Sequence, residues 1–160
     1  MRTAQEYFDE YAESHQNKTN KLIHWFCVPT IFFCVTAILF QVKLNYLFSE
    51  ETINMVHLHF NLAHLVLFFA TLFYIQLSIK LAIGTAGFAV LCLEICDLLE
   101  THNYPLGPIA ITLFVLAWIG QFFGHYIEGK KPSFLKDIQF LLIGPAWLLG
   151  FIYRYLGIRL

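Results

Sequence analysis

The chain has 160 residues, of which 58% are hydrophobic, 18% are aromatic and only 13% are charged. A soluble domain carries about 25% charged residues and leaves much of its surface in water, so this composition indicates a protein embedded in a membrane. With 10 basic and 11 acidic side chains the net charge is −1, which argues against a nucleic-acid partner. The four cysteines form no CxxC motif and suggest packing rather than a disulfide framework.

The N-terminal segment, residues 3–16, has the pattern of an amphipathic helix. Apolar and aromatic residues recur on one face at helical spacing and end at His15, while acidic residues occupy the other face. We expect this helix to lie on the membrane surface or against the rest of the protein. The polar residues that follow predict a break, with Thr19 or Asn20 capping the next helix.

Five apolar stretches follow, and a bilayer is crossed by a helix of about 20 residues. The stretches cover residues 22–42, 53–79, 81–99, 107–127 and 138–156. Pro29 lies inside the first stretch and should kink it, because proline leaves a carbonyl without its usual donor. We therefore predict an all-α integral membrane bundle with four or five transmembrane helices, forming a single domain over residues 1–160.

The distribution of basic residues predicts the orientation of the bundle. If all five stretches span the membrane, one side carries seven basic residues and the other carries three. The first set is Arg2, Lys18, Lys21, Lys80, Lys130, Lys131 and Lys136, and the second is Lys43, Arg154 and Arg159. The positive-inside rule then places the N-terminus in the cytoplasm. A re-entrant stretch in place of one span would change part of this assignment.

Two groups of polar residues should meet at the cytoplasmic face. His15, Asn20 and His24 form an H-x4-N-x3-H pattern at the start of the first span, and Asn20 and His24 share a helix face. Near the end of the fourth span, a second stripe on one helix face includes Gln121, His125 and Glu128 together with Trp118.

Three imidazoles and a carboxylate at one membrane depth suit a divalent transition metal. The metal ligands would be His15, His24, His125 and Glu128, and the amides of Asn20 and Gln121 would orient the imidazoles. The alternative is that each histidine is an interfacial residue that hydrogen-bonds a carbonyl. Spacing alone leaves both readings open.

A further polar group is predicted on the opposite side of the membrane. It contains His57, His59, Asn61, His64, Glu94, Asp97, Glu100 and His102. A second metal site or a proton path would use such residues, but a buried polar network between two helices is the interpretation we favour. Lys130 and Lys131 follow Glu128 directly, and they either anchor the helix end at the cytoplasmic face or bind a substrate carboxylate.

Residues 15–33 and 118–145 together resemble the two signature regions of the membrane-bound 2-hydroxy fatty acid dioxygenases of fatty-acid α-oxidation. The shared pattern is H-x4-N-x3-H followed by V-P, then Q-F-x-G-H-x-x-E-x-[KR]-[KR]-P and a later G-P. The two regions cover about a third of the chain.

The resemblance implies an iron(II)-dependent enzyme that shortens a long-chain 2-hydroxy fatty acid by one carbon with O2. It implies the endoplasmic-reticulum membrane in a eukaryote, or the inner (plasma) membrane in a bacterium. His15, His24 and His125 match the motif histidines and Glu128 the motif acid. Oxidation of a 2-hydroxy acid to the shorter acid and CO2 releases four electrons, which O2 accepts, so no further reductant is required.

The main alternative is a non-enzymatic membrane protein that binds haem, a quinone or lipid through its intramembrane histidines. Two histidines on facing helices can ligate haem, although the sequence contains no CxxCH for covalent attachment. The oligomeric state is not predicted by the sequence.

Overall fold

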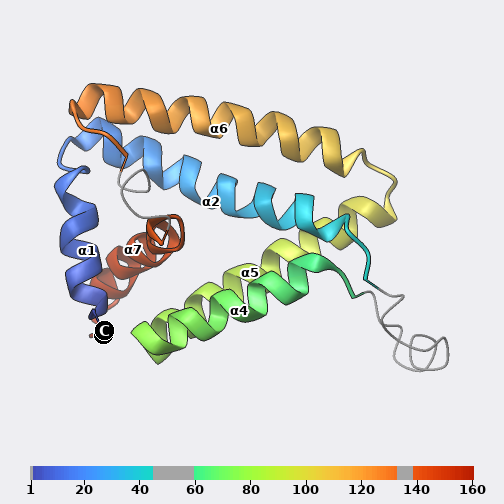
Figure 1. Cartoon of the computed structure of the whole chain (residues 1–160), viewed down its shortest axis with the longest axis horizontal. Coiled ribbons are helices and arrows are strands. Elements are labelled where there is room, and N and C mark those ends of the chain that lie inside the picture. Colours follow the sequence, from blue (N-terminus) through green and yellow to red (C-terminus); the bar gives the residue numbers. More distant parts are fainter. Residues whose placement is uncertain (1, 45–59, 133–138) are drawn as a thin grey trace.

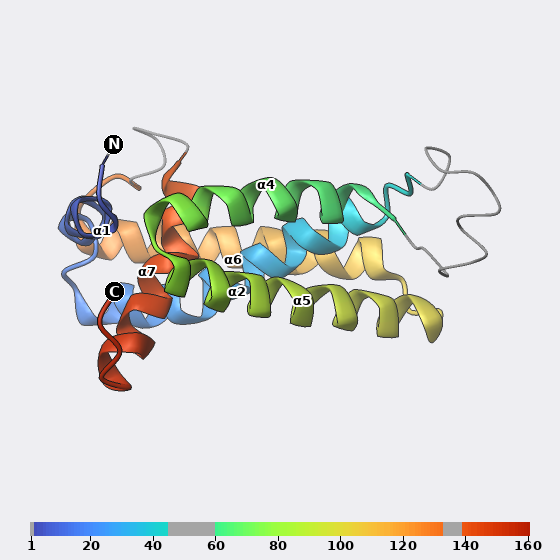
Figure 2. The ribbon, with the colours of Figure 1, turned by 90° about the horizontal axis from the view of Figure 1, so that it is seen from below.

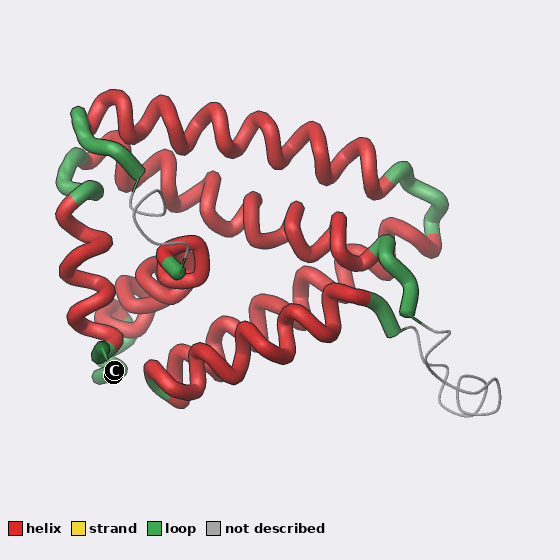
Figure 3. The backbone as a smooth tube through the Cα atoms, viewed as in Figure 1, coloured by secondary structure: helices red, strands yellow, loops and turns green. Residues whose placement is uncertain are grey.

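The computed structural model describes residues 2–44, 60–132 and 139–160. Six helices occur in these ranges, together with an isolated antiparallel bridge between Lys43 and Asn61. The helices are α1 (Ala4–Glu13), α2 (Lys18–Phe40), α4 (Leu62–Leu77), α5 (Ile79–Thr101), α6 (Leu106–Glu128) and α7 (Phe140–Tyr155). The described part of the chain contains no strand (Figure 3), and the predicted all-α fold is confirmed.

Three of the helices are long and apolar enough to cross a membrane. These are α2, α5 and α6, each with 23 residues. The apolar helices α4 and α7 have 16 residues each, fewer than the roughly 20 that span a hydrocarbon core. Residues 53–59 of the predicted second span lie outside the described residues. The chain is therefore an integral membrane bundle, while a count of four or five spans stays a prediction.

The long helices and α4 run alongside one another, whereas α1 and α7 lie across one end of this bundle (Figures 1 and 2). The first residues of α7 pack on α1, and the chain end that follows α7 reaches the start of α5. There the hydroxyl of Tyr153 donates to the carbonyl of Lys80 at 2.7 Å, and the Lys80 ammonium donates to the carbonyl of Arg159. Our expectation that Arg159 lies on the opposite side from Lys80 is wrong, because α7 crosses the end of the bundle rather than its length.

The pair α2 and α6 forms the most extensive helix contact in the described part of the chain, and two glycines explain why. A Cβ at Gly120 would lie 2.8 Å from the Cys27 sulfur, and a Cβ at Gly124 would overlap the side-chain oxygen of Asn20. Small residues at this G-x-x-x-G spacing let two helix backbones approach closely. The contact brings the first turns of α2 beside the last turns of α6.

Polar caps define where the first two helices begin. Thr3 and Glu6 form a reciprocal capping box at the start of α1. The N-cap of α2 is Asn17, whose side-chain oxygen accepts from the backbone N–H groups of Thr19 and Asn20 at 2.8 and 3.4 Å. The predicted cap at Thr19 or Asn20 is thus wrong by two or three residues, and α2 continues through Pro29.

Candidate metal centre

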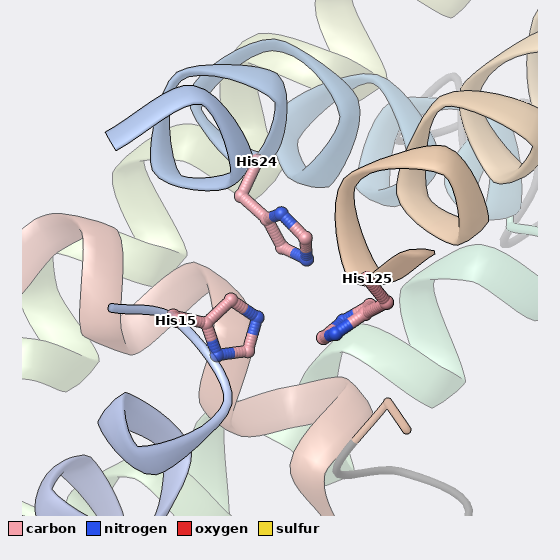
Figure 4. A group of neighbouring side chains, drawn as sticks. All are labelled: His15, His24 and His125. Atoms are coloured by element: carbon pink, nitrogen blue, oxygen red, sulfur yellow. The ribbon is translucent and has the colours of Figure 1, made fainter. Parts of the chain in front are cut away.

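Three histidines from three separate segments meet at the end of the bundle where α1 and α7 lie (Figure 4). His15 follows α1, His24 belongs to α2, and His125 belongs to α6. Their ring centroids are 4.3 to 4.9 Å apart, and the three ring planes cross at 74 to 87°. One ring nitrogen from each residue lies within 4.8 Å of the other two. The structure thus brings together the three histidines that the sequence singled out.

Backbone carbonyls fix the tautomers of two of the rings. The Nδ1 of His15 lies 2.5 Å from the carbonyl oxygen of Tyr11, and the Nδ1 of His24 lies 2.9 Å from that of Asn20. A carbonyl oxygen only accepts, so each Nδ1 carries the proton and each Nε2 presents a lone pair. Each carbonyl belongs to the residue four positions before its histidine. Backbone carbonyls orient the imidazole rings of metal ligands in the same way.

The lone pairs that result are buried. His15 and His24 are fully buried and His125 is 5% exposed. The Nε2 atoms of His15 and His24 and the Nδ1 of His125 are buried without a hydrogen-bond partner. Unpaired buried polar atoms are costly, and the two Nε2 acceptors of His15 and His24 cannot satisfy one another. A cation would satisfy all three, so the residues present fit a divalent metal of the kind that imidazole binds.

Burial also keeps the ring of His15 neutral. Removal from water, reinforced by the neighbouring His24, lowers the pKa of His15 from 6.5 to about 3. A neutral imidazole is the form that ligates a metal. Aromatic residues enclose this ring. Tyr11 stacks on it with centroids 4.0 Å apart, and Trp147 of α7 packs 5.4 Å away.

Glu128 links the loop that carries His15 to the end of α6. Its two carboxylate oxygens accept from the backbone N–H groups of Gln16 and Asn17, each at 2.8 Å. The Asn20 amide donates to the same carboxylate at 3.1 Å and to the carbonyl of Ser14, also at 3.1 Å. These bonds position the segments that carry the histidines, and the group of converging ligand atoms contains the three histidines without Glu128.

A cavity of about 450 Å3 begins beside the histidines and continues between α2, α4, α6 and α7. His125 and Gln121 are part of its wall. Gln121 was predicted to orient the imidazoles. Backbone carbonyls hold the rings of His15 and His24 instead, and Gln121 lines the cavity.

The 2-hydroxy-palmitic acid dioxygenase Mpo1-like family model matches residues 1–156 of the chain. The chain belongs to this family. A curated relative, the 2-hydroxy-palmitic acid dioxygenase MPO1 of Saccharomyces cerevisiae, is 29% identical over 142 residues, which cover 87% of this chain and 73% of that protein. The comparison with solved structures gives no match. In this Mpo1-like chain both signature regions, residues 15–33 and 118–145, contribute to the histidine cluster.

The other predicted site residues in the described part of the chain do not join the group of converging ligand atoms. Lys130 and Lys131 are exposed and do not line the cavity in the described part of the chain. His57 and His59 lie outside the described residues. The ring of His64 lies 3.0 Å from the side-chain oxygen of Asn61.

The predicted buried network between the second and third apolar stretches is wrong for its acidic members and for His102. Glu94, Asp97 and His102 are exposed. Glu100 forms an exposed ion pair with Lys43, 2.7 Å away, rather than with a histidine. Lys43 reaches Glu100 because the end of α2 lies beside the end of α5.

Two residues of the site were missed by the sequence analysis. Helical spacing placed Tyr11 on one face with His15, four residues later, but Tyr11 was not assigned to the site. Trp147 has no such signal, because it comes from α7 and reaches His15 only through the crossing of α7 over the bundle end.

Proposed function

We propose that the chain is an iron(II)-dependent dioxygenase that converts a long-chain 2-hydroxy fatty acid to the fatty acid one carbon shorter. The reaction consumes one O2 and releases CO2 and water: R–CH(OH)–COOH + O2 gives R–COOH + CO2 + H2O. The C1–C2 bond breaks, C2 becomes the new carboxyl carbon, and the four electrons lost by the acid reduce O2. Membership of the Mpo1-like family supports this class of reaction and substrate.

The observation that carries the proposal is the set of three buried, unpartnered imidazole nitrogens within 4.8 Å of one another. His15, His24 and His125 would hold the ion, and coordination positions left open by a three-histidine set would accept substrate and O2. Bound iron would act as a Lewis acid and a template for the 2-hydroxy acid and O2.

The protein's own residues hold the metal-binding rings in position and keep water out of the site. The carbonyls of Tyr11 and Asn20 hold two rings in the ligating tautomer. We assign Glu128 to the closure of the loop over the site rather than to the metal itself, because its oxygens already accept three hydrogen bonds. Tyr11 and Trp147 exclude water from the side of His15.

The rival reading of a haem protein is not supported by the geometry. Haem ligands must leave room for a macrocycle between them, whereas the three rings lie with their centroids 4.3 to 4.9 Å apart. This spacing favours a single ion.

The end of the bundle that holds the histidines is proposed to face the cytoplasm. The crossing of α7 places Arg159 beside Lys80 at this end, while Lys43 lies at the far end. The basic residues are then divided more unequally between the two ends of the bundle than the sequence alone predicted. By the positive-inside rule, this supports a cytoplasmic position for the end that holds the histidines. The endoplasmic reticulum, or the inner membrane in a bacterium, stays our prediction for the location.

The experiment is an anaerobic metal reconstitution followed by a turnover assay. Purified protein in detergent is stripped with a chelator, loaded with Fe2+, Zn2+ or no metal, and given a long-chain 2-hydroxy acid with or without O2. We expect the odd-chain acid and CO2 from an even-chain substrate only with Fe2+ and O2 together. Equal turnover by the stripped protein, or a Soret band in the purified protein, would contradict the proposal.

A further inference from the structure

The cavity that begins at the histidines has one polar end and one apolar end. The polar side chains Tyr11, Gln121, His125 and Gln139 lie where α1 and α7 cross the bundle. The far end is lined by Thr36 and Leu39 of α2 and by Val66 and Leu67 of α4. The hydroxyl of Thr36 donates to the carbonyl of Phe32 at 2.9 Å, so it offers the cavity no free donor. Such a cavity suits an amphiphile with its head at the histidines.

The far end of the cavity is closed by packed side chains. Leu39 and Leu67 pack against a separate buried cluster that includes Phe40 and Ala63, which are 2% and 0% exposed. Nearer the histidines, Ala70 packs against the cluster built around Tyr11 and Phe140. The cavity therefore lies between the two hydrophobic clusters of the protein, and a chain that enters it stops at Leu39 and Leu67.

The length of the cavity matches one long acyl chain. Its wall on α2 runs from Val28 to Leu39, which at about 1.5 Å per residue is about 16 Å. The acyl chains of one leaflet fill about half of a hydrocarbon core that is about 30 Å thick. A cavity of this length holds an acyl chain of the size that membrane lipids carry.

One flank of the cavity is open toward the lipid. Val35 of α2 and Val66 of α4 both line the cavity, yet each is 40% exposed. Val35 belongs to a helix of membrane-spanning length and composition, so its exposed side meets acyl chains rather than water. An amphiphile dissolved in the bilayer has a lateral route from the lipid into the cavity.

From these observations we infer that the cavity binds the acyl chain of the substrate, that the chain enters sideways from the bilayer, and that Leu67 and Ala70 limit its length. The identity of the head group rests on the proposed function, but the placement of the chain does not. Leu67 forms part of the closed end. Ala70 lies about one turn nearer the histidines on the same helix, where a larger side chain would narrow the cavity.

The test compares three variants of the full chain with the wild type in lipid nanodiscs. L67A extends the far end and A70L narrows the middle. The control L65A removes the same atoms from α4 at a residue that is 38% exposed and does not line the cavity. Relative kcat/KM is measured over a series of 2-hydroxy acids of increasing length.

We expect L67A to raise the relative kcat/KM for longer acids by about fourfold per added methylene. This factor corresponds to the free energy gained when one CH2 group is buried. A70L should lose activity toward the longest acids while it keeps activity toward the short ones. L65A should have the same length preference as the wild type. The same length profile in all four proteins, with turnover intact, would overturn the inference and leave the proposed function standing.

A second measurement does not depend on turnover. A 2-hydroxy acid with a diazirine at its terminal carbon is photolysed in the wild-type protein, and the labelled residues are identified by mass spectrometry. We expect labels at Leu39, Val66 and Leu67. Labels confined to lipid-facing residues such as Phe68 and Phe69 would overturn the inference. Labels at the far end of the cavity in a protein that turns over no 2-hydroxy acid would support the chain site and contradict the proposed function.

Discussion

The carboxylate of Glu128, in the last turn of α6, accepts a hydrogen bond from the backbone N–H of Asn17, 2.8 Å away at the N-cap of α2. Asn17 in turn uses its own side chain to cap α2. One carboxylate thus joins the end of α6 to the start of α2 and to the loop that ends α1. Each of these three segments carries one of the three histidines, so the mutual position of the rings depends on this junction.

We predict that E128Q weakens metal binding by about 10- to 100-fold without abolishing it, the range for groups that orient metal ligands. The amide replaces one acceptor oxygen with a donor that faces a backbone N–H, which should also cost about 1–3 kcal/mol of unfolding free energy. Isothermal titration with Fe2+ or Co2+ and thermal unfolding measure both effects. E13Q, at an exposed position of α1, is the matched control. Complete loss of metal in E128Q would instead identify Glu128 as a ligand.

A second prediction concerns the histidines themselves. H24A and H125A should each lose bound metal and the oxygen-dependent shortening of a 2-hydroxy acid, because every ligand of a small site is required. In the metal-free state, H24A should lower the free energy of unfolding by only about 1 kcal/mol, because the variant loses the hydrogen bond to the Asn20 carbonyl. Metal analysis, turnover and thermal unfolding are compared with H102A, whose ring is exposed and lies outside the cluster. If H24A and H125A keep full activity, His24 and His125 are structural.

The sequence was sufficient to predict the helical membrane fold and the meeting of His15, His24 and His125. Apolar periodicity reports helices, and the alternation of helix direction places the start of α2 and the end of α6 at one level. The hydrogen bonds of Glu128 to the α1–α2 loop were not predictable in this way. In the sequence motif this carboxylate follows His125 closely, which indicated a metal ligand. Its distance from Gln16 and Asn17 depends instead on the path of the α1–α2 loop, which the motif does not report.

The path of α7 was also beyond the sequence. Residues 138–156 are as apolar as a membrane span, and composition does not tell a span from a helix that lies across the end of a bundle. The contacts that fix α7 join residues remote in sequence, such as Tyr7 with Gln139 at 2.6 Å and Tyr74 with the carbonyl of Leu142 at 2.7 Å. The cavity exists only because α7 and α4 close it against α2 and α6, so it could not be derived before the fold.

A third prediction tests the close contact of α2 and α6. G124A should destabilise the protein by about 1–3 kcal/mol, because the new methyl group overlaps the Asn20 side chain and forces the two helices apart. Asn20 also binds Glu128 and positions His24, so metal affinity should fall in the same variant. G87A is the control. A Cβ at Gly87 meets nothing within 4 Å, so the change should stabilise α5 by about 0.5–1 kcal/mol. Equal unfolding temperatures for the two variants would refute the packing account.

The last prediction concerns the metal-free protein in acid. Because the pKa of His15 is about 3 when folded and 6.5 ordinarily, the unfolded chain binds a proton between these values that the folded chain does not. The contribution of His15 to the free energy of unfolding is therefore largest above about pH 6.5, and it falls as the pH decreases toward about 3. Thermal unfolding in detergent with a chelator, from neutral pH down to about pH 4, measures the slope.

H15Q should flatten part of that slope, since glutamine does not titrate, and H102Q should leave it unchanged because His102 is exposed. Saturating Fe2+ or Zn2+ should extend the stability of the wild type to lower pH, because the ion occupies the lone pairs that protons would otherwise take. The same acid slope in the wild type and H15Q would show that His15 is not held neutral by the fold. In that case the burial of its Nε2 could no longer be used to support a metal site.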